Sequence, residues 1–262
     1  MISVAINGVC GRMGRIMLRL AFDDPEVMVA VGLEHAGHPD IGKDLGRIAG
    51  GDAYGIAVGD KIEQTVDVLI DFSSPEGTMN RLDDCAGQNI AMVTGTTGFT
   101  EEQMERIRET AGRIGIVQAP NMAVGVNVLF SLIRSAAGLL DEEYDAEIVE
   151  VHHRFKADAP SGTAKQLVRM IAEGRNIETP KVVYGREGRP GQRPPGEIGV
   201  HAVRAGDIVG EHRVIFSTLG ESLEITHRAH NREGFARGAI RAAKFVAGKE
   251  PGLYSMSDVL GL

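Results

Sequence analysis

The sequence is poor in cysteine, and it lacks long apolar runs. Its 262 residues contain only Cys10 and Cys85, which stand far apart, and two distant thiols provide neither a disulfide framework nor the ligand spacing of a metal site. No apolar run approaches the ~18–20 residues of a membrane span, and no basic and then apolar leader opens the chain. These absences exclude a disulfide-stapled domain and a membrane-spanning helix. We therefore expect a cytoplasmic protein without a bound metal.

A broad positive surface is also missing. The formal net charge is −8, and residues 1–126 contain 10 Lys and Arg against 18 Asp and Glu. Residues 151–190 reverse this balance, with 8 Lys and Arg against 4 Asp and Glu. Nucleic-acid-binding proteins usually show a wide basic face, whereas a local basic cluster in an acidic chain suits a small anionic ligand. We expect no nucleic-acid partner and no membrane partner.

Glycine, in contrast, is abundant, with 34 residues, and the first 118 residues alternate strand and helix signals. Helix starts are marked by Pro75-Glu76 and by Thr100-Glu101-Glu102. Near-continuous apolar runs predict parallel strands buried on both faces; they lie at 3–6, 27–31, 66–71, 90–93 and 115–117. Repeated β-α-β units predict an α/β fold with a Rossmann-type doubly wound parallel sheet.

The pattern changes after Pro120. Helices are predicted at 125–140, 161–174 and 232–247, and strands at 145–152, 197–203, 207–218 and 221–228. The Pro- and Gly-rich stretch 185–196 excludes regular structure there. This half of the chain predicts a smaller α+β domain with an open mixed sheet.

A glycine motif follows the first predicted strand and opens a helix. It is the run Gly8-Val9-Cys10-Gly11-Arg12-Met13-Gly14, in which glycines allow a tight turn and let a pyrophosphate approach the N–H groups of the helix terminus. Glu34 lies 20 residues beyond Gly14, where an acidic side chain binds a ribose 2′-hydroxyl. A tight turn that binds nothing is the alternative. Cys10 is expected to fill the turn rather than to act as a nucleophile, because no base stands beside it.

Two further loops follow predicted strands, and each could also be an ordinary turn. They are Gly95-Thr96-Thr97-Gly98 and Ala119-Pro120-Asn121-Met122. Ligands bind such sheets at the carboxyl ends of the strands, so we expect Gly95, Thr96, Thr97 and the run Ala119, Pro120, Asn121, Met122 to reach the nicotinamide side of a dinucleotide.

The richest segment is Glu150-Val151-His152-His153-Arg154-Phe155-Lys156-Ala157-Asp158-Ala159-Pro160-Ser161-Gly162-Thr163-Ala164. Imidazoles move protons near neutral pH, and a helix N-terminus binds anions. Gly162 allows close approach and Thr163 offers an N–H and a hydroxyl, so both are predicted to hold a carboxylate. Adjacent histidines on a strand point to opposite faces, so they are not expected to share one task. A zinc site is disfavoured because no third ligand has a recognisable spacing. Lys165, Arg169 and Arg175 are interpreted as a solvated helix face.

These motifs, together with the run Arg204-Ala205-Gly206-Asp207-Ile208-Val209-Gly210-Glu211-His212, resemble bacterial dihydrodipicolinate reductase over nearly the whole chain. The resemblance implies reduction of 4-hydroxy-tetrahydrodipicolinate with NADH or NADPH, in lysine and diaminopimelate biosynthesis. It implies that His152 transfers a proton, that His153 contacts the substrate, and that Lys156 donates a second proton and holds a carboxylate. It also implies a dinucleotide-binding domain of residues 1–126 and 234–262, a substrate domain of residues 127–233, a flexible junction near 120–127 and 230–236, and a homotetramer.

Cofactor choice is where the sequence departs from this pattern. His35 stands where relatives that favour NADPH usually carry Arg, so we expect NADH to be used at least as well as NADPH. His35 could instead be a plain loop residue, with the cofactor choice set elsewhere, for example by Lys43.

Two other functions remain open. Another NAD-dependent reductase, such as an amino-acid dehydrogenase, would share the first 35 residues, and a non-catalytic dinucleotide sensor would need no proton donor.

Overall fold

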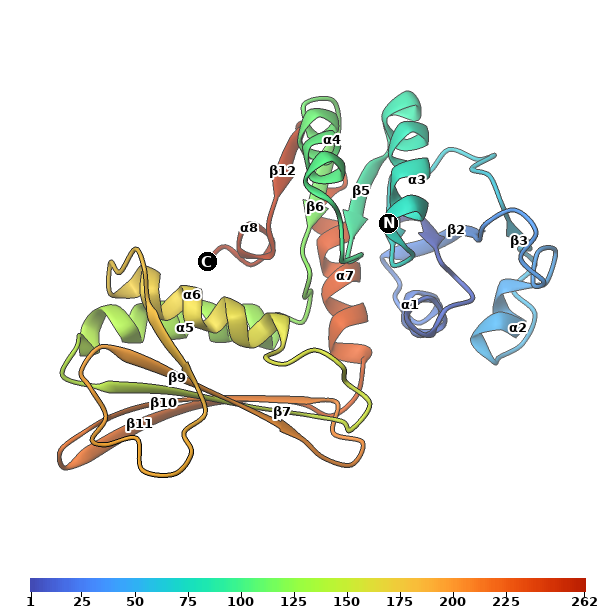
Figure 1. Cartoon of the computed structure of the whole chain (residues 1–262). Helices are drawn as coiled ribbons and strands as arrows, with labels where there is room; N and C mark the ends of the chain where they lie inside the picture. The colour runs from blue at the N-terminus through green and yellow to red at the C-terminus, as the bar shows by residue number, and fades with distance from the viewer. The chain divides into compact units, whose positions relative to one another are not determined.

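The structure, a computed structural model, describes residues 1–262 and separates into two compact units (Figure 1). Unit 1 comprises Met1–Val124 and Arg232–Gly261, and unit 2 comprises Gly125–Asn231, with which the terminal Leu262 is grouped. The chain thus passes between the units after Val124 and before Arg232; the division expected from the sequence was after residues 126 and 233. No helix is both long and apolar enough to cross a membrane.

Unit 1 is built on a seven-stranded sheet whose paired strands are all parallel. Its strands, in spatial order, are β12 (Gly252–Tyr254), β6 (Gly115–Gln118), β5 (Ala91–Thr94), β4 (Val68–Asp71), β1 (Ile2–Asn7), β2 (Val27–Leu33) and β3 (Val58–Gly59). The central strands are almost entirely buried, which explains their unbroken apolar sequences. The predicted Rossmann-type doubly wound sheet is confirmed.

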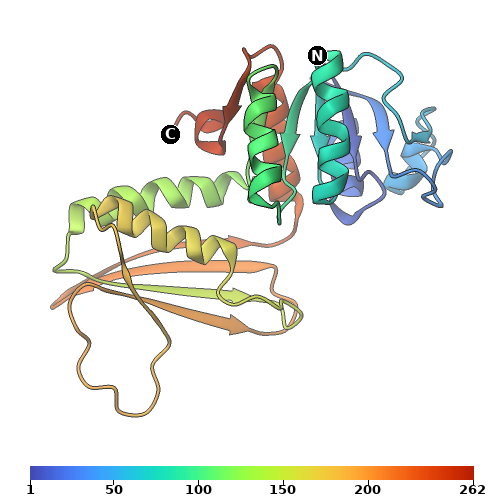
Figure 2. The ribbon, with the colours of Figure 1, turned by 45° about the horizontal axis from the view of Figure 1, so that its top comes forward.

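Helices pack on both faces of this sheet and divide its core in two. One core receives α1 (Arg12–Phe22), α2 (Leu45–Ala49), α7 (Glu233–Val246) and α8 (Met256–Leu260); the other receives α3 (Pro75–Gln88) and α4 (Glu101–Ala111). Figure 2 shows α3 and α4 side by side on one face of the sheet. The predicted helix starts are confirmed: Pro75 opens α3 after the Ser74 cap, and Thr100 forms a capping box with Gln103.

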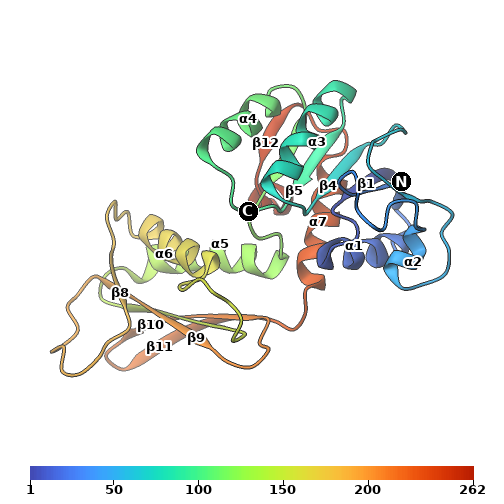
Figure 3. The same cartoon turned by 45° about the vertical axis from the view of Figure 1, so that its right-hand side comes forward.

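Unit 2 is a five-stranded mixed sheet with two helices on one face (Figure 3). In spatial order its strands are β11 (Glu221–Ala229), β10 (Gly210–Thr218), β7 (Asp145–His152), β9 (Glu197–Arg204) and β8 (Lys181–Tyr184). The first two pairs are antiparallel and the last two are parallel, so the prediction of an open mixed sheet is confirmed. The helices are α5 (Val124–Leu140) and α6 (Gly162–Gly174). Their apolar sides meet the sheet in a third core, which includes Leu129, Leu167, Val214 and Phe216.

Several elements escaped prediction. The short β3, β8, β12, α2 and α8 carry too few residues for a periodic pattern, and β10 begins at Gly210 rather than at residue 207. The interpretation of Arg175 as part of a solvated face was wrong. Its guanidinium is partly buried after α6, donates to the Tyr144 carbonyl at 2.6 Å and lies 5.8 Å from the centre of the Phe216 ring. Lys165 and Arg169 are exposed, as expected.

Candidate active site

The glycine motif of unit 1 forms a tight turn between β1 and α1. Gly8 has a φ of +74°, and a Cβ there would lie 2.8 Å from the Phe72 carbonyl oxygen. A Cβ on Gly14 would lie 2.3 Å from the Gly8 carbonyl oxygen, so the turn and the first turn of α1 pack too closely for a side chain. Gly11 precedes α1 as its N-cap. The turn therefore presents backbone at a helix N-terminus, where an anion can approach.

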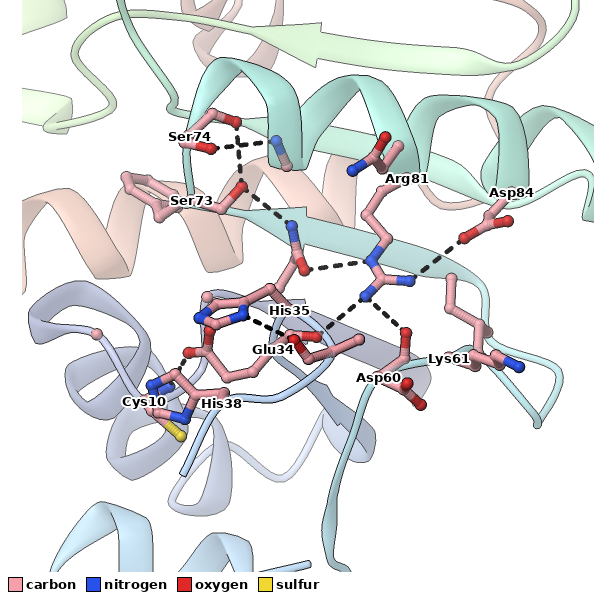
Figure 4. Close-up of a pocket in the computed structure, with 18 of the residues that line it drawn as sticks. Cys10, Glu34, His35, His38, Asp60, Lys61, Ser73, Ser74, Arg81 and Asp84 are labelled. Atoms are coloured by element: carbon pink, nitrogen blue, oxygen red, sulfur yellow. Dashed lines mark hydrogen bonds and ion pairs between the residues drawn. The ribbon is translucent and has the colours of Figure 1, made fainter. Parts of the chain in front are cut away.

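A pocket of about 900 Å³ opens beside this turn. Of the predicted residues it is lined by Gly8, Gly11, Glu34 and His35. Glu34 follows β2, and its Oε1 accepts a hydrogen bond from the Cys10 N–H at 2.8 Å, so the carboxylate is anchored to the glycine turn (Figure 4). His35 is exposed at the rim, and its Nδ1 lies 3.1 Å from the Ala36 carbonyl oxygen. A buried acid and an exposed imidazole thus stand next to each other at the end of β2.

Cations near this pocket are already paired. Arg81, on α3, donates Nε–H to Asn7 and its terminal N–H groups to Asp84 and to two carbonyl oxygens, those of Glu34 and Asp60 (Figure 4). Four of its five N–H donors are therefore engaged. Asp40, which does not line the pocket, pairs with both Lys43 and Arg15. Of the lysine and arginine side chains that line the pocket, only Lys61 lacks such a network.

Asp40 also forms a cluster with Cys10 and His38, whose possible metal-binding atoms lie within 4.8 Å of one another. Burial and the nearby carboxylates of Glu34 and Asp40 raise the pKa of the Cys10 thiol to about 12, so it stays protonated at neutral pH. A metal would have to displace both this proton and the cations that pair with Asp40. The cluster therefore does not favour a bound metal ion.

The loops after β4 and β5 are joined by a buried carboxylate. Asp71, at the end of β4, is fully buried, and its carboxylate oxygens accept hydrogen bonds of 2.5–3.0 Å from five side chains: Asn7, Ser73, Thr78, Thr94 and Thr96. Thr96 is thus engaged inside the protein, whereas Thr97 is exposed. A Cβ on Gly95 would lie 2.4 Å from the Phe72 ring, so this loop also needs glycine.

The remaining predicted residues of unit 1 do not line the pocket. Arg12 is exposed at the start of α1, and Met13 packs partly against the core. After β6, Ala119 and Met122 are buried and Pro120 is exposed, while Asn121 Oδ1 accepts from the Ala123 N–H at 3.0 Å. These residues, like Gly95 to Thr97, follow the carboxyl ends of β5 and β6.

In unit 2 the register of the sheet gathers a second cluster. On one side of β7, Glu150 pairs with His212 of β10, and His212 pairs in turn with His227 of β11. On the other side of β7, His152 pairs with Arg204 of β9. Paired residues share a face, and Glu150 and His152 are two residues apart on one strand, so they point the same way. The face is the one that α5 and α6 cover.

Glu150 is the centre of this cluster. It is fully buried, and it accepts two hydrogen bonds from the Arg204 guanidinium, both at 2.9 Å, and one from the Ser161 N–H at 3.0 Å. Its Oε2 also lies 2.5 Å from His152 Nδ1. Burial disfavours the charged carboxylate, but the hydrogen bonds from Arg204, His152 and Ser161 outweigh it and hold the pKa of Glu150 below its usual value.

The carboxylate fixes the tautomer of His152. An ionised carboxylate only accepts hydrogen bonds, so Nδ1 carries the imidazole proton and Nε2 carries the lone pair. Burial lowers the pKa of His152; Glu150 opposes this shift, and the charges of Lys156 and Arg204 add to it. His152 is therefore neutral at pH 7 and can accept a proton at Nε2.

The other predicted residues of unit 2 lie on the loop and helix that follow β7. Lys156 Nζ is 2.8 Å from Asp158, and His153 Nδ1 is a buried atom without a hydrogen-bond partner. Ser161 caps α6 by accepting from the Ala164 N–H at 3.2 Å. Gly162 is exposed, and a Cβ there would meet no atom within 4 Å, while Thr163 is half-buried. Open space therefore adjoins the N-terminus of α6.

Sequence reasoning missed the roles of Glu150, Arg204, Ser161 and His212 in this cluster. The signal for Glu150 was available, because its i, i+2 spacing from His152 on a strand places both on one face. Arg204 and His212 lie in the run from residue 204 to residue 212, whose place beside β7 depends on a long-range pairing that no local pattern reveals.

Comparisons with known proteins cover the chain from end to end. A family model described as "Dihydrodipicolinate reductase, N-terminus" matches residues 2–122, and one described as "Dihydrodipicolinate reductase, C-terminus" matches residues 125–260. The chain is 48% identical over 267 residues to the 4-hydroxy-tetrahydrodipicolinate reductase of Anaeromyxobacter dehalogenans strain 2CP-C, covering 100% of this chain and 98% of the other. It is 49% identical over 261 residues to that of Rubrobacter xylanophilus, covering 99% and 98%.

Among solved structures, a dipicolinate-bound dihydrodipicolinate reductase from Paenisporosarcina sp. TG-14 matches with a TM-score of 0.78 and 28% identity, covering 97% of each chain. Both units thus have counterparts in a single solved protein.

Proposed function

Because the chain belongs to the dihydrodipicolinate reductase family, we propose that it reduces 4-hydroxy-tetrahydrodipicolinate to tetrahydrodipicolinate in lysine and diaminopimelate biosynthesis, with a nicotinamide dinucleotide as reductant. The observation that carries this proposal is the cluster around Glu150. It sets a neutral imidazole with a fixed tautomer near the N-terminus of a helix and near an ammonium group. That combination suits proton transfer to a small anion.

Unit 1 is proposed to hold the dinucleotide. The fit rests on the glycine turn, where a Cβ at Gly8 or Gly14 would clash with backbone, and on the pocket of about 900 Å³ beside it. Gly8, Gly11, Arg12, Met13 and Gly14 would hold the pyrophosphate at the start of α1. When bound, the nicotinamide would supply the hydride.

The same geometry supports NADH as a reductant at least as good as NADPH. Glu34 is held by the Cys10 N–H, which leaves its other oxygen to accept from a ribose hydroxyl. A 2′-phosphate would instead meet this carboxylate, and Arg81 and Lys43 already have partners. His35 adds an imidazole at the rim rather than a guanidinium.

The loops after β5 and β6 are proposed to contact the nicotinamide end of the cofactor. They contain Gly95, Thr96 and Thr97, and Ala119, Pro120, Asn121 and Met122. Both follow carboxyl ends of neighbouring parallel strands, the edge at which such sheets bind ligands. The Asp71 network supports this role, because it holds Thr96 and the end of β5 in one arrangement.

Unit 2 is proposed to hold the substrate, which carries two carboxylates. Gly162 and Thr163 would receive one at the N-terminus of α6, and His153 and Lys156 would contact the dianion through an unpartnered buried nitrogen and an ammonium group. The dipicolinate in the related structure is a planar dicarboxylate of the same ring size, consistent with such a site.

The proton chemistry is proposed to centre on His152 and Lys156. After the substrate loses water, a hydride adds to a carbon of the conjugated ring, and the resulting enamine must take up a proton. The two substrate carboxylates would favour the protonated imidazole, opposing the effect of burial. Glu150 would keep the ring oriented while Nε2 delivers the proton, and Lys156 would be the second donor.

The test is steady-state oxidation of NADH by the purified protein with the cyclic imine substrate. Turnover that depends on the imine and that dipicolinate inhibits supports the proposal. Turnover with an amino-acid or keto-acid pair but not with the imine would favour another NAD-dependent reductase. Tight NADH binding without any turnover would favour a dinucleotide sensor.

Unit 2 also supports a homotetramer as a further proposal. The sheet face away from α5 and α6 carries apolar side chains such as Val149, Val151 and Val203, of which Val203 is exposed. Light scattering should give four times the chain mass.

A cytoplasmic location is proposed because Cys10 and Cys85 are free thiols, as expected in a reducing compartment.

A further inference from the structure

His212 is a buried histidine to which neither the sequence motifs nor the proposed reaction gives a role. It lies on β10, next to Glu150 in the register, and only 4% of its surface is exposed. Its ring meets the His152 ring edge to face, with centres 5.1 Å apart and planes at 74°. One side of the His152 imidazole is therefore covered by a second imidazole.

The ring nitrogens of His212 differ in their surroundings. Nε2 lies 3.2 Å from the hydroxyl of Ser161, whereas Nδ1 is buried without a partner. Ser161 in turn caps α6 through its hydroxyl and donates its N–H to Glu150. Ser161 therefore connects His212 to the carboxylate that orients His152.

His212 stays uncharged under working conditions. Burial lowers its pKa to about 3, and the neighbouring His152 acts in the same direction. A neutral ring can pack against His152 in either protonation state of that residue, whereas a charged one would repel the imidazolium. Its packing role therefore does not change when His152 gains a proton.

Gly210, two residues earlier on β10, bounds His152 on another side. A Cβ there would lie 3.2 Å from His152 Nε2 and 3.4 Å from Cδ2. Nε2 is the atom proposed to carry the reacting proton, so even a methyl group on β10 would press against it. The absence of a side chain at residue 210 leaves room for the imidazole.

We infer that His212 and Gly210 are positioning residues: His212 packs against the His152 imidazole and Gly210 leaves the space that the ring occupies, so that the ring keeps the single orientation in which Nδ1 faces Glu150 and Nε2 remains available. The inference rests on the proposed function for its catalytic consequence, but the orientation itself can be measured without turnover. A 1 Å displacement of a catalytic group can cost on the order of 10²-fold in rate, so small changes at these two positions should be visible.

The decisive comparison is His212→Gln against His212→Asn. The Gln amide reaches the place of Nε2 and can bond the Ser161 hydroxyl, whereas the Asn amide reaches the place of Nδ1, which has no partner. His212→Gln should keep kcat within a few-fold of the wild type. His212→Asn should lower kcat by about 10–10²-fold with an unchanged Kd for NADH.

Gly210→Ala tests the other contact, with Gly87→Ala as its control. A Cβ at Gly87, an exposed position on α3, would meet no atom within 4 Å. Gly210→Ala should lower kcat by about tenfold or more, and Gly87→Ala should leave it unchanged.

Nitrogen NMR of the histidine rings separates this inference from the proposed function. In the wild type, His152 should give the signal of a neutral ring protonated at Nδ1. His212→Asn and Gly210→Ala should shift or broaden that signal, and His212→Gln should preserve it. If His212→Asn and Gly210→Ala both keep the wild-type signal, the inference is wrong, whatever the substrate proves to be. A wild type that shows the expected signal but does not reduce the imine would instead overturn the proposed function alone.

Discussion

Each unit contains one fully buried carboxylate at the centre of a hydrogen-bond network, and the two networks differ in their donors. Asp71 in unit 1 receives four hydroxyl groups and one amide, with no cation. Glu150 in unit 2 receives a guanidinium, an imidazole and a backbone N–H. Hydroxyl groups can rotate to donate or accept, whereas a guanidinium only donates.

This difference matches the tasks proposed for the two units. The Asp71 network joins the ends of β1, β4 and β5 and consists of a carboxylate, hydroxyl groups and one amide, without an imidazole, so it can fix loops around a cofactor without taking part in proton transfer. The Glu150 network includes His152, whose charge can change near neutral pH. One carboxylate supports geometry, and the other supports a proton-transfer group.

The largest effect should follow from removing the group that distinguishes the Glu150 network. His152→Gln should lower kcat by about 10²–10⁴-fold, since it removes proton delivery. The Kd for NADH should not change, because His152 belongs to unit 2 and the glycine turn to unit 1. Stopped-flow and fluorescence titration measure the two quantities. A variant with nearly normal kcat would refute the assignment.

The two networks should also respond differently to neutralisation of their carboxylates. Glu150→Gln leaves Arg204 without its charged partner and should reduce the free energy of unfolding by about 3–5 kcal/mol. Asp71→Asn, the matched change, should cost about 1–2 kcal/mol, because the surrounding hydroxyl groups can turn and accept from the new amide. Urea unfolding gives both values. Equal losses would mean that the identity of the donors is unimportant.

Lys156 tests the proposed link between the proton-transfer site and substrate binding. Lys156→Ala should weaken binding of dipicolinate by ~1.5–3 kcal/mol, the contribution of a charge-assisted hydrogen bond, and should lower kcat as well. Calorimetric titration of the wild type and the variant provides the comparison, with Lys165→Ala, an exposed lysine on α6, as control. Unchanged dipicolinate affinity in Lys156→Ala would remove Lys156 from the carboxylate site.

The buried His212 should make unit 2 sensitive to mild acid. Its pKa is about 3 in the folded protein against 6.5 for the free side chain, so below pH 6.5 the unfolded chain binds a proton that the folded chain does not. Stability should therefore fall as the pH is lowered from about 6.5 towards 3.

Between pH 6.5 and 5, before most carboxylates titrate, the loss from His212 should reach about 2 kcal/mol. His212→Gln should show a correspondingly flatter pH dependence in urea unfolding. His152 and His227, whose pKa values are also lowered, remain in both proteins. Parallel curves for the two proteins would contradict the buried neutral state of His212.

Local sequence predicted those parts of the fold that depend on the spacing of apolar residues and on residues that begin or end a helix or a turn. The apolar runs gave the central strands of unit 1, and Pro75 and Thr100 marked helix starts because capping depends on adjacent residues. The glycine motif predicted the turn between β1 and α1 because a positive φ and a close contact restrict the residue type.

Local sequence could not predict the two carboxylate networks. Thr96 meets Asp71 across 25 residues, and Arg204 meets Glu150 across 54, and only the pairing of distant strands brings such residues together.

The smallest effect concerns the rim of the unit 1 pocket. A new cation there would give unit 1 a charged donor beside a carboxylate, as Arg204 is beside Glu150 in unit 2. The Glu34 carboxylate is anchored to the Cys10 N–H and would repel a 2′-phosphate. Arg81 already has four acceptors and Lys43 pairs with Asp40, so these cations offer little unpaired positive charge to bind it. His35→Arg would place a permanently charged group with bidentate donors at an exposed position beside Glu34. We expect kcat/KM for NADPH to improve relative to NADH by ~1–2 kcal/mol, the contribution of one charged contact.

His35→Gln, which adds no charge, is the control, and both cofactors should be compared at fixed ionic strength because exposed charges are screened by salt. A wild type that strongly prefers NADPH, or an Arg variant with an unchanged ratio, would place 2′-phosphate recognition at another cation, of which Lys61 on the pocket wall is the first to test.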